Sequence, residues 1–440
     1  MKPSGRLAAT LEILQTTSDS RWPMDGTIGD YMRSRRYIGS KDRAAIVERT
    51  YDIVRAQARL TWHLDRNHAE VNPRNLLIAH LVVVEGLDVT ALEALFDGAQ
   101  YAPTPLSDDE KKLATKLKGA TLEAPSMPDV VRAECPPQHE TTLKEFFGDA
   151  FETEMKAFIS SAPLDLRVNI KTISRNDAKE SLELNKVATD ETPFSPWGLR
   201  ARGKAYLSET KAFRKGHIEI QDEGSQLIAV LCDAKPGQQV LDYCAGSGGK
   251  TLALASAMNV KGRIVAMDTE ENRLKKARER FRRAHAHDII EVRPLSDEKN
   301  RKWLRRQKET FDIALADVPC SGTGTWRRNP DLRWRQFGPT LDALLQTQVE
   351  ILDKVAKTVK VGGRLVYATC SLLPQENEKQ IEAFLSRHPE FTLAPLPANI
   401  PGPGPYMRLT PLRHKTDGFF GAVLTRTTTS KATSESDQED

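Results

Sequence analysis

The sequence predicts an α/β protein in which a Rossmann-like, doubly wound sheet follows a small α+β lobe and an all-α N-terminal domain. Three observations lead to this fold class. Short apolar runs alternate with helical patterns from residue 236 onward, which is typical of a parallel sheet. A glycine-rich loop, Ala245–Lys250, follows the first of these runs. Residues 1–135 instead place their apolar side chains at helical spacing.

The N-terminal domain, residues 1–135, is expected to be helical. Val47, Tyr51 and Val54 recur at helical spacing. Asn72 and Pro73 form a helix-start signal before an apolar stretch. Proline-rich pieces between residues 102 and 137 mark loops that lead to the next domain.

Residues 140–235 mix strand and helix patterns, and we expect them to form the small α+β lobe. Leu164–Ile173 alternates apolar and polar residues like a strand, and Asn176–Leu184 is a short helical candidate. Gln221–Leu231 has the pattern of a helix that leads into the sheet domain, residues 236–426.

The sheet domain shows alternating strands and helices. The predicted strands are Gln239–Tyr243, Gly262–Asp268, Ile289–Arg293, Phe311–Val318, Gly363–Thr369 and Gly418–Thr425. The predicted helices are Glu270–His285, Leu341–Val359 and Gln375–Arg387. Ligands of doubly wound sheets bind beyond the carboxyl ends of the strands. The glycine loop, Asp268, Asp317, Cys320 and Cys370 all fall at such ends, and this shared placement predicts one site.

Length and composition limit the class of protein. A chain of 440 residues suggests about three domains, and 39% hydrophobic with 28% charged residues is ordinary for a globular protein. The sequence has neither an apolar run of ~18 residues nor the apolar core of a signal peptide, so we expect a cytoplasmic protein without a membrane partner. Five cysteines without CxxC spacing argue against a disulfide framework and a cysteine metal site.

The net charge of +4 is unevenly distributed. Basic clusters occur at Arg278–Arg283, Lys299–Lys308 and Arg327–Arg335. Together they suggest a localised nucleic-acid face, although solvated helix surface is the simpler interpretation of any single cluster. The polar and acidic C-terminal end, residues 427–440, is expected to be a disordered tail.

The glycine loop is neither a GxGxxG fingerprint nor a phosphate-binding GxxxxGK[ST] motif. Gly246, Gly248 and Gly249 let the backbone approach a ligand closely. Asp268 ends the second strand, where a carboxylate can accept hydrogen bonds from ribose hydroxyls. Capping of the following helix is the structural alternative for Asp268.

Two thiols follow neighbouring motifs, Asp317-Val318-Pro319-Cys320 and Thr369-Cys370-Ser371. A thiolate that adds to carbon 6 of cytosine makes carbon 5 nucleophilic toward a methyl donor. That chemistry needs a reactive cysteine, a carboxylate at the base and a proton acceptor. The motifs supply the first two, and the sequence does not identify the acceptor. A buried core cysteine is the structural alternative for Cys370.

The three remaining cysteines receive structural interpretations from the sequence. Cys244 lies inside the glycine loop and is interpreted as a packing residue. Cys135 and Cys232 have no chemical neighbours in sequence and are expected to be structural.

Five motifs, DYCAGSGGKT, MDTEENR, ADVPCSGTGTWRRNPDLRW, YATCSLLPQENE and DGFFGAVL, resemble the Sun/Fmu (RsmB-like, Nop/Sun) family of RNA cytosine-C5 methyltransferases. The resemblance covers about residues 160–426 and implies S-adenosylmethionine as cofactor. It implies that Cys370 is the nucleophile, Cys320 the release residue, and Asp317 a neighbour of the methyl group and target base. The implied cofactor-binding residues are Cys244, Ala245, Gly246, Ser247, Gly248, Gly249, Lys250, Asp268, Arg273, Asp297 and Asp317.

Two positions depart from the family pattern. Ser247 stands where the family commonly has proline, and Pro294–Asp297 replaces the usual Gly-Asp-Ala, which puts contact between Asp297 and the adenine in doubt. Residues 140–220 resemble the family's small RNA-recognition lobe. The helical N-terminus resembles the NusB-like extension of its ribosomal-RNA branch, so we expect it to add RNA or ribosome affinity.

The expected activity is methylation of carbon 5 of a cytosine in RNA through a covalent cysteine intermediate, by a monomer. Ribosomal RNA is the first expected substrate and tRNA the second. A non-catalytic RNA-binding assembly factor with a vestigial site is an alternative, which the presence of Asp317, Cys320 and Cys370 opposes. A small-molecule or protein methyltransferase is another, but it would need neither two thiols nor basic clusters.

Overall fold

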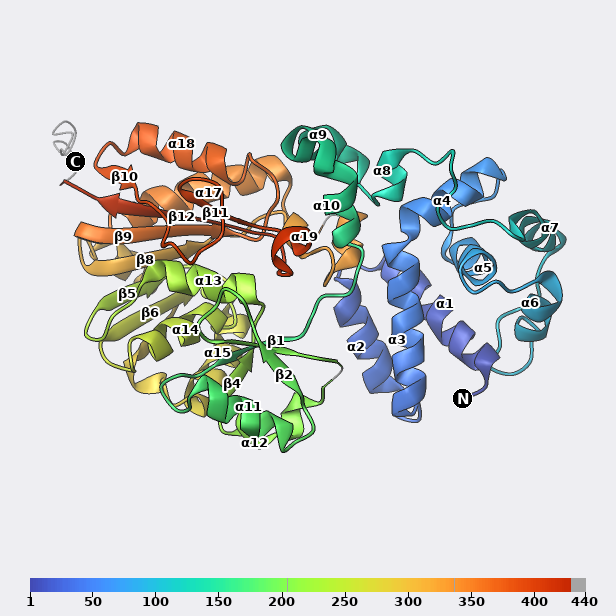
Figure 1. The fold of residues 1–440 in the computed structure, drawn as a ribbon, viewed down its shortest axis with the longest axis horizontal. Helices are drawn as coiled ribbons and strands as arrows, with labels where there is room; N and C mark the ends of the chain where they lie inside the picture. Colours follow the sequence, from blue (N-terminus) through green and yellow to red (C-terminus); the bar gives the residue numbers. More distant parts are fainter. Residues whose placement is uncertain (204, 336, 429–440) are drawn as a thin grey trace. The chain divides into compact units, whose positions relative to one another are not determined.

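The computed structural model describes residues 1–203, 205–335 and 337–428, so most of the predicted disordered tail lies outside the described residues. The chain divides into two compact units. The helical unit comprises Met1–Ser161 and Thr325–Pro339, and the sheet unit comprises Ala162–Gly324 and the chain from Thr340 onward (Figure 1). The helical unit therefore extends past residue 135, the predicted end of the helical domain, and includes a segment that we expected in the sheet domain.

The helical unit is built from helices of 4 to 17 residues, and α5, α6 and α7 each begin at a capping side chain. Its helices are α1 (Pro3–Asp19), α2 (Met24–Ser34), α3 (Ser40–Arg55), α4 (Gln57–Arg66), α5 (Pro73–Val83), α6 (Val89–Leu95), α7 (Asp108–Leu117), α8 (Asp129–Arg132), α9 (Glu140–Phe147) and α10 (Phe151–Ala157). The Asn72 side chain accepts the Asn75 N–H at 2.8 Å, which confirms the predicted start of α5. Ser107 and Glu110 form a capping box on α7. Apolar faces of α1 to α7 share one core, which includes Ile13, Leu60 and Leu77.

The segment Thr325–Pro339, which includes the 3-10 turn η6 (Pro330–Arg333), completes the core of the helical unit. Trp326 is 1% exposed and meets the Phe158 ring edge-on at 6.3 Å. Arg333 is also 1% exposed, and its Nη1 donates to the Glu134 carbonyl at 3.0 Å. The chain thus leaves the sheet unit after Gly324 and re-enters it at Thr340.

The small lobe of the sheet unit is an antiparallel sheet in the order β2-β3-β1-β4. Its elements are β1 (Asp165–Val168), α11 (Arg175–Glu183), β2 (Thr189–Glu191), β3 (Gly198–Ala201), α12 (Lys211–Arg214) and β4 (Ile218–Ile220). Leu166, Val168, Leu182 and Leu199 form its core. Strand β1 is shorter than the predicted strand Leu164–Ile173, but the α+β character of the lobe matches the prediction.

The large sheet has the strand order β10-β12-β9-β8-β5-β6-β7, with β11 paired to β12. Its strands are β5 (Gln239–Asp242), β6 (Arg263–Asp268), β7 (Ile290–Pro294), β8 (Phe311–Asp317), β9 (Val359–Thr369), β10 (Phe391–Leu393), β11 (Tyr406–Leu409) and β12 (Phe419–Arg426). Strands β5 to β9 are parallel. The expectation of a wholly parallel sheet is wrong at one edge, because β12 runs antiparallel to β9 and β10 and β11 run antiparallel to β12.

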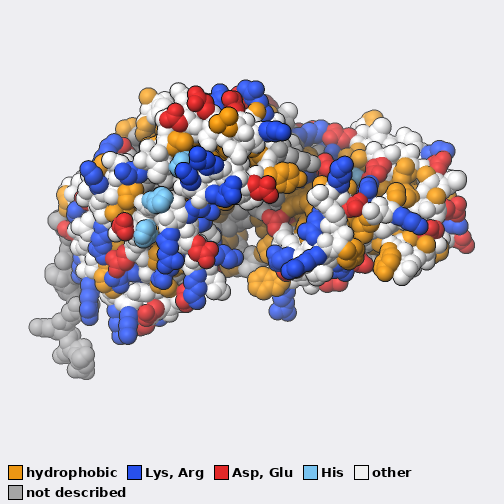
Figure 2. All heavy atoms as spheres, turned by 90° about the horizontal axis from the view of Figure 1, so that it is seen from below, with side chains coloured by type: hydrophobic (Ala, Val, Ile, Leu, Met, Phe, Trp, Pro, Cys, Tyr) orange, Lys and Arg blue, Asp and Glu red, His pale blue; other side chains and the backbone are white. Residues whose placement is uncertain are grey.

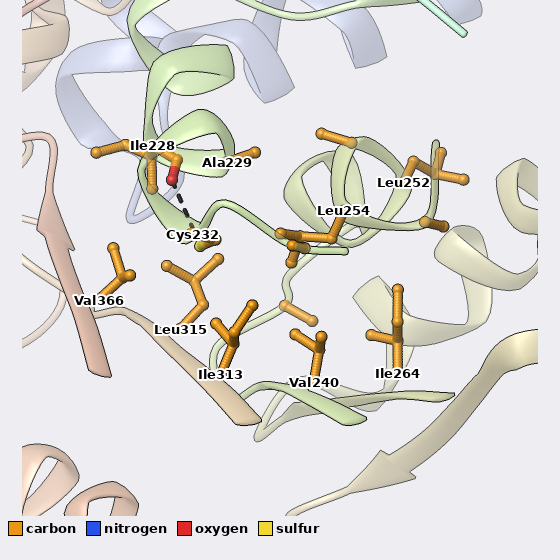
Figure 3. Close-up of a cluster of buried hydrophobic side chains, with 14 of the residues drawn as sticks. Ile228, Ala229, Cys232, Val240, Leu252, Leu254, Ile264, Ile313, Leu315 and Val366 are labelled. Carbon is orange, nitrogen blue, oxygen red and sulfur yellow. Dashed lines mark hydrogen bonds between the residues drawn. The ribbon is translucent and has the colours of Figure 1, made fainter. Parts of the chain in front are cut away.

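Helices cover both faces of the large sheet, which confirms the doubly wound fold (Figure 1). One face packs α13 (Glu223–Cys232), α14 (Gly249–Ala257) and α15 (Glu271–Arg283). The other packs α16 (Glu298–Arg305), α17 (Leu341–Ala356) and α18 (Glu378–Arg387), and the short α19 (Pro411–His414) precedes β12. Figure 3 shows Cys232 in the core between the sheet and helices α13 and α14, where its thiol donates to the Ile228 carbonyl at 3.5 Å. Cys232 is fully buried and Cys135 is 3% exposed, as a structural role requires.

Candidate active site

The glycine loop joins β5 to α14 in a conformation that needs glycine. Gly246 and Gly248 have φ angles of +55° and +80°. A Cβ on Gly248 would lie 2.4 Å from the Phe281 ring, so a side chain cannot be placed there. The Ser247 carbonyl accepts a hydrogen bond from Arg280 Nη1 at 2.6 Å. This contact fixes the loop at the position where the family pattern has proline.

Asp268 ends β6 and faces this loop. Its Oδ2 accepts the Gly246 N–H at 2.7 Å, and its Oδ1 accepts the Glu270 N–H at 2.8 Å. The carboxylate therefore both ties down the glycine loop and starts the next helix, so the two interpretations of Asp268 are compatible. Each oxygen retains a lone pair for a ribose hydroxyl. These residues fit the methionine and ribose parts of S-adenosylmethionine.

The two thiols predicted from the motifs lie together. Cys320 Sγ and Cys370 Sγ are 3.4 Å apart, and all five cysteines are free thiols. Strands β8 and β9 are neighbours, which brings the loops at their carboxyl ends side by side. The hydrogen bond to Cys370 and then burial raise the pKa of Cys320 well above its usual value. Either sulfur can donate this hydrogen bond, and the raised pKa favours a protonated Cys320.

A buried carboxylate, Glu376, holds the two thiol loops in register. Its Oε1 accepts the Ser321 N–H at 2.8 Å and its Oε2 accepts the Ser321 hydroxyl at 2.5 Å. Gln348 Nε2 donates both to Glu376 Oε1 and to the Pro319 carbonyl, each at 3.0 Å. The Ser321 and Ser371 hydroxyls lie 3.2 Å apart. We did not single out Glu376 from the sequence, although an acidic residue inside the YATCSLLPQENE motif was the available signal.

Lys250 and Asp317 form an ion pair beside the thiols. Lys250 Nζ lies 2.7 Å from Asp317 Oδ2, and the two side chains are 13% and 26% exposed. Burial by itself would lower the pKa of Lys250, but the charge of Asp317, its hydrogen bond and the charge of Cys370 raise it overall. The Lys250 ammonium therefore lies next to the Asp317 carboxylate and within electrostatic reach of Cys370.

Asp242 is a fully buried carboxylate directly before the glycine loop. Its Oδ2 accepts the Thr251 hydroxyl at 2.6 Å, and its Oδ1 has no hydrogen-bond partner among the described residues. Burial raises the pKa of Asp242 to about 7. Cys244, two residues on, is partly buried and packs against the second core layer, as a packing residue should. Burial, followed by the charges of Asp317 and Asp268, raises the pKa of Cys244 well above its usual value.

The two remaining candidate cofactor-binding residues, Arg273 and Asp297, lie in different surroundings. The Arg273 guanidinium lies against the glycine loop, with Nη2 only 2.6 Å from where a Cβ on Gly246 would sit. Asp297 is exposed and caps α16, accepting the Lys299 N–H at 2.9 Å. Arg273 thus belongs to the loop's surroundings, whereas Asp297 has a local structural partner.

The three basic clusters differ in solvent exposure and in ion pairing. Arg327 and Arg333 are 4% and 1% exposed, so we correct the expectation that Arg327–Arg335 forms an open RNA-binding surface. Arg280 and Arg283 pair with Glu219 of the small lobe. Most of Lys299–Lys308 is exposed. Figure 2 shows Lys and Arg side chains spread over the visible face of the sheet unit.

A glycine loop after the first strand and a buried carboxylate at the end of the second are where Rossmann-like methyltransferases hold their cofactor. The sheet unit therefore has the architecture of an S-adenosylmethionine-dependent methyltransferase. No helix of the described chain combines the length and apolar character that crossing a membrane requires.

Comparison with known proteins identifies the family within this class. The family described as 16S rRNA methyltransferase RsmB/F matches residues 229–425. A Synechocystis protein named probable ribosomal RNA small subunit methyltransferase B is 35% identical over 290 residues, which cover 64% of either chain. The ribosomal RNA small subunit methyltransferase B of Yersinia pestis is 28% identical over 89% of this chain and 92% of its own.

Two solved structures are similar as well. The structure of PH0851 has a TM-score of 0.76 and 27% identity, with 97% of this chain and 99% of that chain covered. A methyltransferase homologue from Pyrococcus horikoshii has a TM-score of 0.58 and 30% identity, with 69% of this chain and 99% of that chain covered. The chain belongs to the RsmB/F family of S-adenosylmethionine-dependent RNA methyltransferases, which confirms the Sun/Fmu resemblance of its motifs.

Proposed function

We propose that this enzyme methylates carbon 5 of a cytosine in small-subunit ribosomal RNA, with Cys370 as nucleophile and Cys320 as release residue. The observation that carries the proposal is the 3.4 Å separation of the two thiols beside the Lys250–Asp317 pair. The names of the Synechocystis and Yersinia relatives support the substrate class. We propose further that it acts as a monomer in the cytoplasm, with RNA as its partner.

The geometry divides the chemistry among four side chains. Cys370 adds to carbon 6 of the base, which raises electron density at carbon 5. Asp317 and Lys250, a hydrogen-bond acceptor and a donor held together, meet the polar edge of the base. S-adenosylmethionine, held by the glycine loop and Asp268, supplies the electrophilic methyl group. Release breaks the carbon 5–hydrogen bond, whose proton passes to a base from solvent, and the carbon 6–sulfur bond, whose electron pair leaves on Cys370. Cys320 Sγ lies 3.4 Å from Cys370 Sγ, and its raised pKa suits it to donate a proton to that departing sulfur.

The two cysteines should be separable by mutation. Cys370→Ala removes the covalent step, so neither methylated RNA nor an RNA–protein adduct should form. Cys320→Ala should still attack and methylate but fail to let go, so RNA accumulates on the protein as a denaturant-resistant shifted band. Cys232→Ala, which removes a core thiol of the same unit, is the control and should turn over normally.

Other outcomes overturn specific parts of this proposal. If RNA accumulates covalently on Cys370→Ala and not on Cys320→Ala, Cys320 is the nucleophile and Cys370 the release residue. If RNA accumulates on neither variant, the covalent cytosine mechanism is wrong. Mapping of 5-methylcytosine in total RNA from cells with and without the gene identifies the substrate, and a lost site in tRNA alone would contradict ribosomal RNA.

The cofactor contacts can be tested with two aspartates at neighbouring strand ends. Asp268→Ala should weaken S-adenosylmethionine binding by about 1–3 kcal/mol, because charge-assisted hydrogen bonds to the ribose are lost. Asp297→Ala should leave affinity nearly unchanged, because that carboxylate caps its own helix. Titration calorimetry measures both, and equal losses would return Asp297 to the cofactor site.

A further inference from the structure

The helical unit carries a long groove along α1 and α2. The groove consists of two adjoining hollows with volumes of about 1060 and 740 Å³. Glu12, Tyr31 and Arg35 border both hollows. The larger hollow continues to the loop between α1 and α2, and the smaller one continues to the loop around Tyr101. We call this surface the α1–α2 groove. It lies wholly within the helical unit and contains none of the residues of the candidate active site.

Exposed aromatic rings are concentrated in the α1–α2 groove. Trp22, Tyr37 and Tyr101 are 74%, 74% and 72% exposed, and all three line it. Within the described chain, Tyr206 is the one other aromatic side chain with comparable exposure. Clustered exposed aromatic rings mark interaction surfaces, because such rings bury large area at low entropic cost when a partner docks. Figure 2 shows hydrophobic side chains between charged ones on the visible face of this unit.

The loop that displays Trp22 is fixed at both ends rather than frayed. Trp22 N–H donates to the Ser20 hydroxyl at 2.9 Å, and the Ser20 carbonyl accepts from Arg335. On the other side, Met24 N–H donates to Asp331 Oδ2 at 2.7 Å. Both anchors come from Thr325–Pro339, so this buried segment sets the position of the exposed tryptophan.

The charge of the larger hollow opposes a nucleic-acid ligand. Glu12, Asp19, Asp25 and Asp30 line that hollow, and Arg35 is its one cationic residue, whereas the smaller hollow adds Lys2 and the Met1 amino group, which pairs with Asp42. Arg35 is already engaged, because its Nη2 lies 3.0 Å from Glu12 and its guanidinium stacks 3.8 Å above the Tyr31 ring. Phosphates would be repelled here, whereas Lys and Arg side chains would meet carboxylates and aromatic faces together.

We propose that the α1–α2 groove docks a cationic, amphipathic segment of a protein partner. Apolar side chains of that segment would fill the hollows between Trp22 and Tyr37, and its Lys and Arg residues would lie over Asp19 and Asp30. This interaction is separate from methyl transfer.

The test uses the full chain and three fluorescein-labelled probes, without cofactor or substrate. One probe is an amphipathic peptide of about 15 residues built from Leu, Lys and Arg, which is long enough to span a helical groove. The second is its twin with Glu in place of Lys and Arg, and the third is single-stranded oligouridylate of similar length. Fluorescence anisotropy should show binding of the basic peptide and no binding of the acidic twin.

Charge and ring variants locate the contact. Asp19→Lys combined with Asp30→Lys should weaken the basic peptide by about tenfold or more, and Trp22→Ala by a similar factor. Glu145→Lys combined with Asp149→Lys makes the same charge change on the same unit away from the groove and should have little effect. Equal losses in both double variants would reduce the effect to net charge and overturn the proposal.

Two further results identify a different occupant. If Trp22→Ala or Tyr37→Ala lowers oligouridylate binding, the rings stack on bases and the groove is an RNA site. If wild-type protein forms a dimer in sedimentation experiments that Trp22→Ala abolishes, the occupant is a second copy of the chain. Either result contradicts docking of a basic protein segment, and neither depends on whether the enzyme methylates ribosomal RNA.

Discussion

The helical unit and the sheet unit each contain a carboxylate with no exposed surface, Glu134 and Asp242. The two carboxylates differ in how completely they are hydrogen-bonded. Glu134 accepts Arg59 Nε at 2.7 Å and the Ala58 N–H at 2.8 Å, so both of its oxygens have partners. Asp242 accepts one hydroxyl, from Thr251, and its other oxygen has no hydrogen-bond partner among the described residues. Burial raises the pKa of both groups, against the opposing charge of Arg59 at Glu134 and the Thr251 hydrogen bond at Asp242.

The difference teaches that a buried charge does not by itself indicate an active site. Glu134 lies where helices meet and serves the packing of the helical unit. Asp242 lies at a strand end, directly before the glycine loop and within the electrostatic reach of Lys250 and Asp317. An under-satisfied carboxylate is costly to fold around, and such groups persist where the site needs them.

Breaking the satisfied pair should have the largest effect on stability. Arg59→Ala leaves the Glu134 charge buried without its guanidinium and should reduce the free energy of unfolding by about 3–5 kcal/mol. Combining Arg59→Met with Glu134→Leu should recover most of this loss, because two apolar side chains need no ionic partner. Urea unfolding measures both. Lys112→Ala, which breaks the exposed pair with Asp109, is the control and should cost less than about 1 kcal/mol.

The under-satisfied carboxylate should appear in the pH dependence of stability. Between its ordinary value of 3.8 and about 7, the unfolded chain releases the Asp242 proton while the folded chain retains it, so folding stability falls as pH rises. Asp242→Asn cannot titrate and lacks this contribution. Relative to Asp242→Asn, the wild type should lose about 2–4 kcal/mol between these limits. Parallel stability curves for the two proteins would mean that Asp242 is already ionised in the fold.

Glu376 sharpens the comparison, because it is a satisfied carboxylate that belongs to the site. Glu376→Gln keeps its size but weakens the hold on Ser321, so the Cys320 loop should lose its register with Cys370. We expect turnover to fall by about tenfold, near 1.4 kcal/mol, with little change in cofactor affinity. Glu378→Gln, whose carboxylate instead pairs with Arg408, is the matched control. Equal loss of stability and activity in both variants would reduce Glu376 to a packing role.

Reversal of exposed charges should have the smallest effect on stability and on RNA affinity. Reversing Lys299 and Lys302 together should leave stability unchanged, lower RNA affinity by a few fold, and flatten its dependence on salt by about one unit of slope per lost phosphate contact. Reversing Lys112 and Lys116 of the helical unit is the control. An unchanged salt slope would show that Lys299–Lys308 is solvated surface and not an RNA contact.

The sequence alone determined the features that depend on local pattern. Alternating apolar runs and helices predicted the doubly wound sheet, and the glycine loop, Asp268 and both thiol motifs were correctly placed at strand ends. These predictions succeeded because hydrophobic periodicity and glycine-bounded turns reflect short-range physics. The antiparallel β12 was missed, because alternation within one strand carries no information about the direction of its neighbour.

The tertiary structure decided which of these features meet. Cys320 reaches Cys370, and Lys250 reaches Asp317, because β8 lies between β5 and β9, an order that sequence spacing does not reveal. The basic segment Arg327–Arg335 looked like open surface by composition, yet Arg327 and Arg333 are buried, because the helical unit needs the segment to close its core. Charge is a local property of the chain, whereas burial depends on which distant segments cover a side chain, and only the folded structure supplies that.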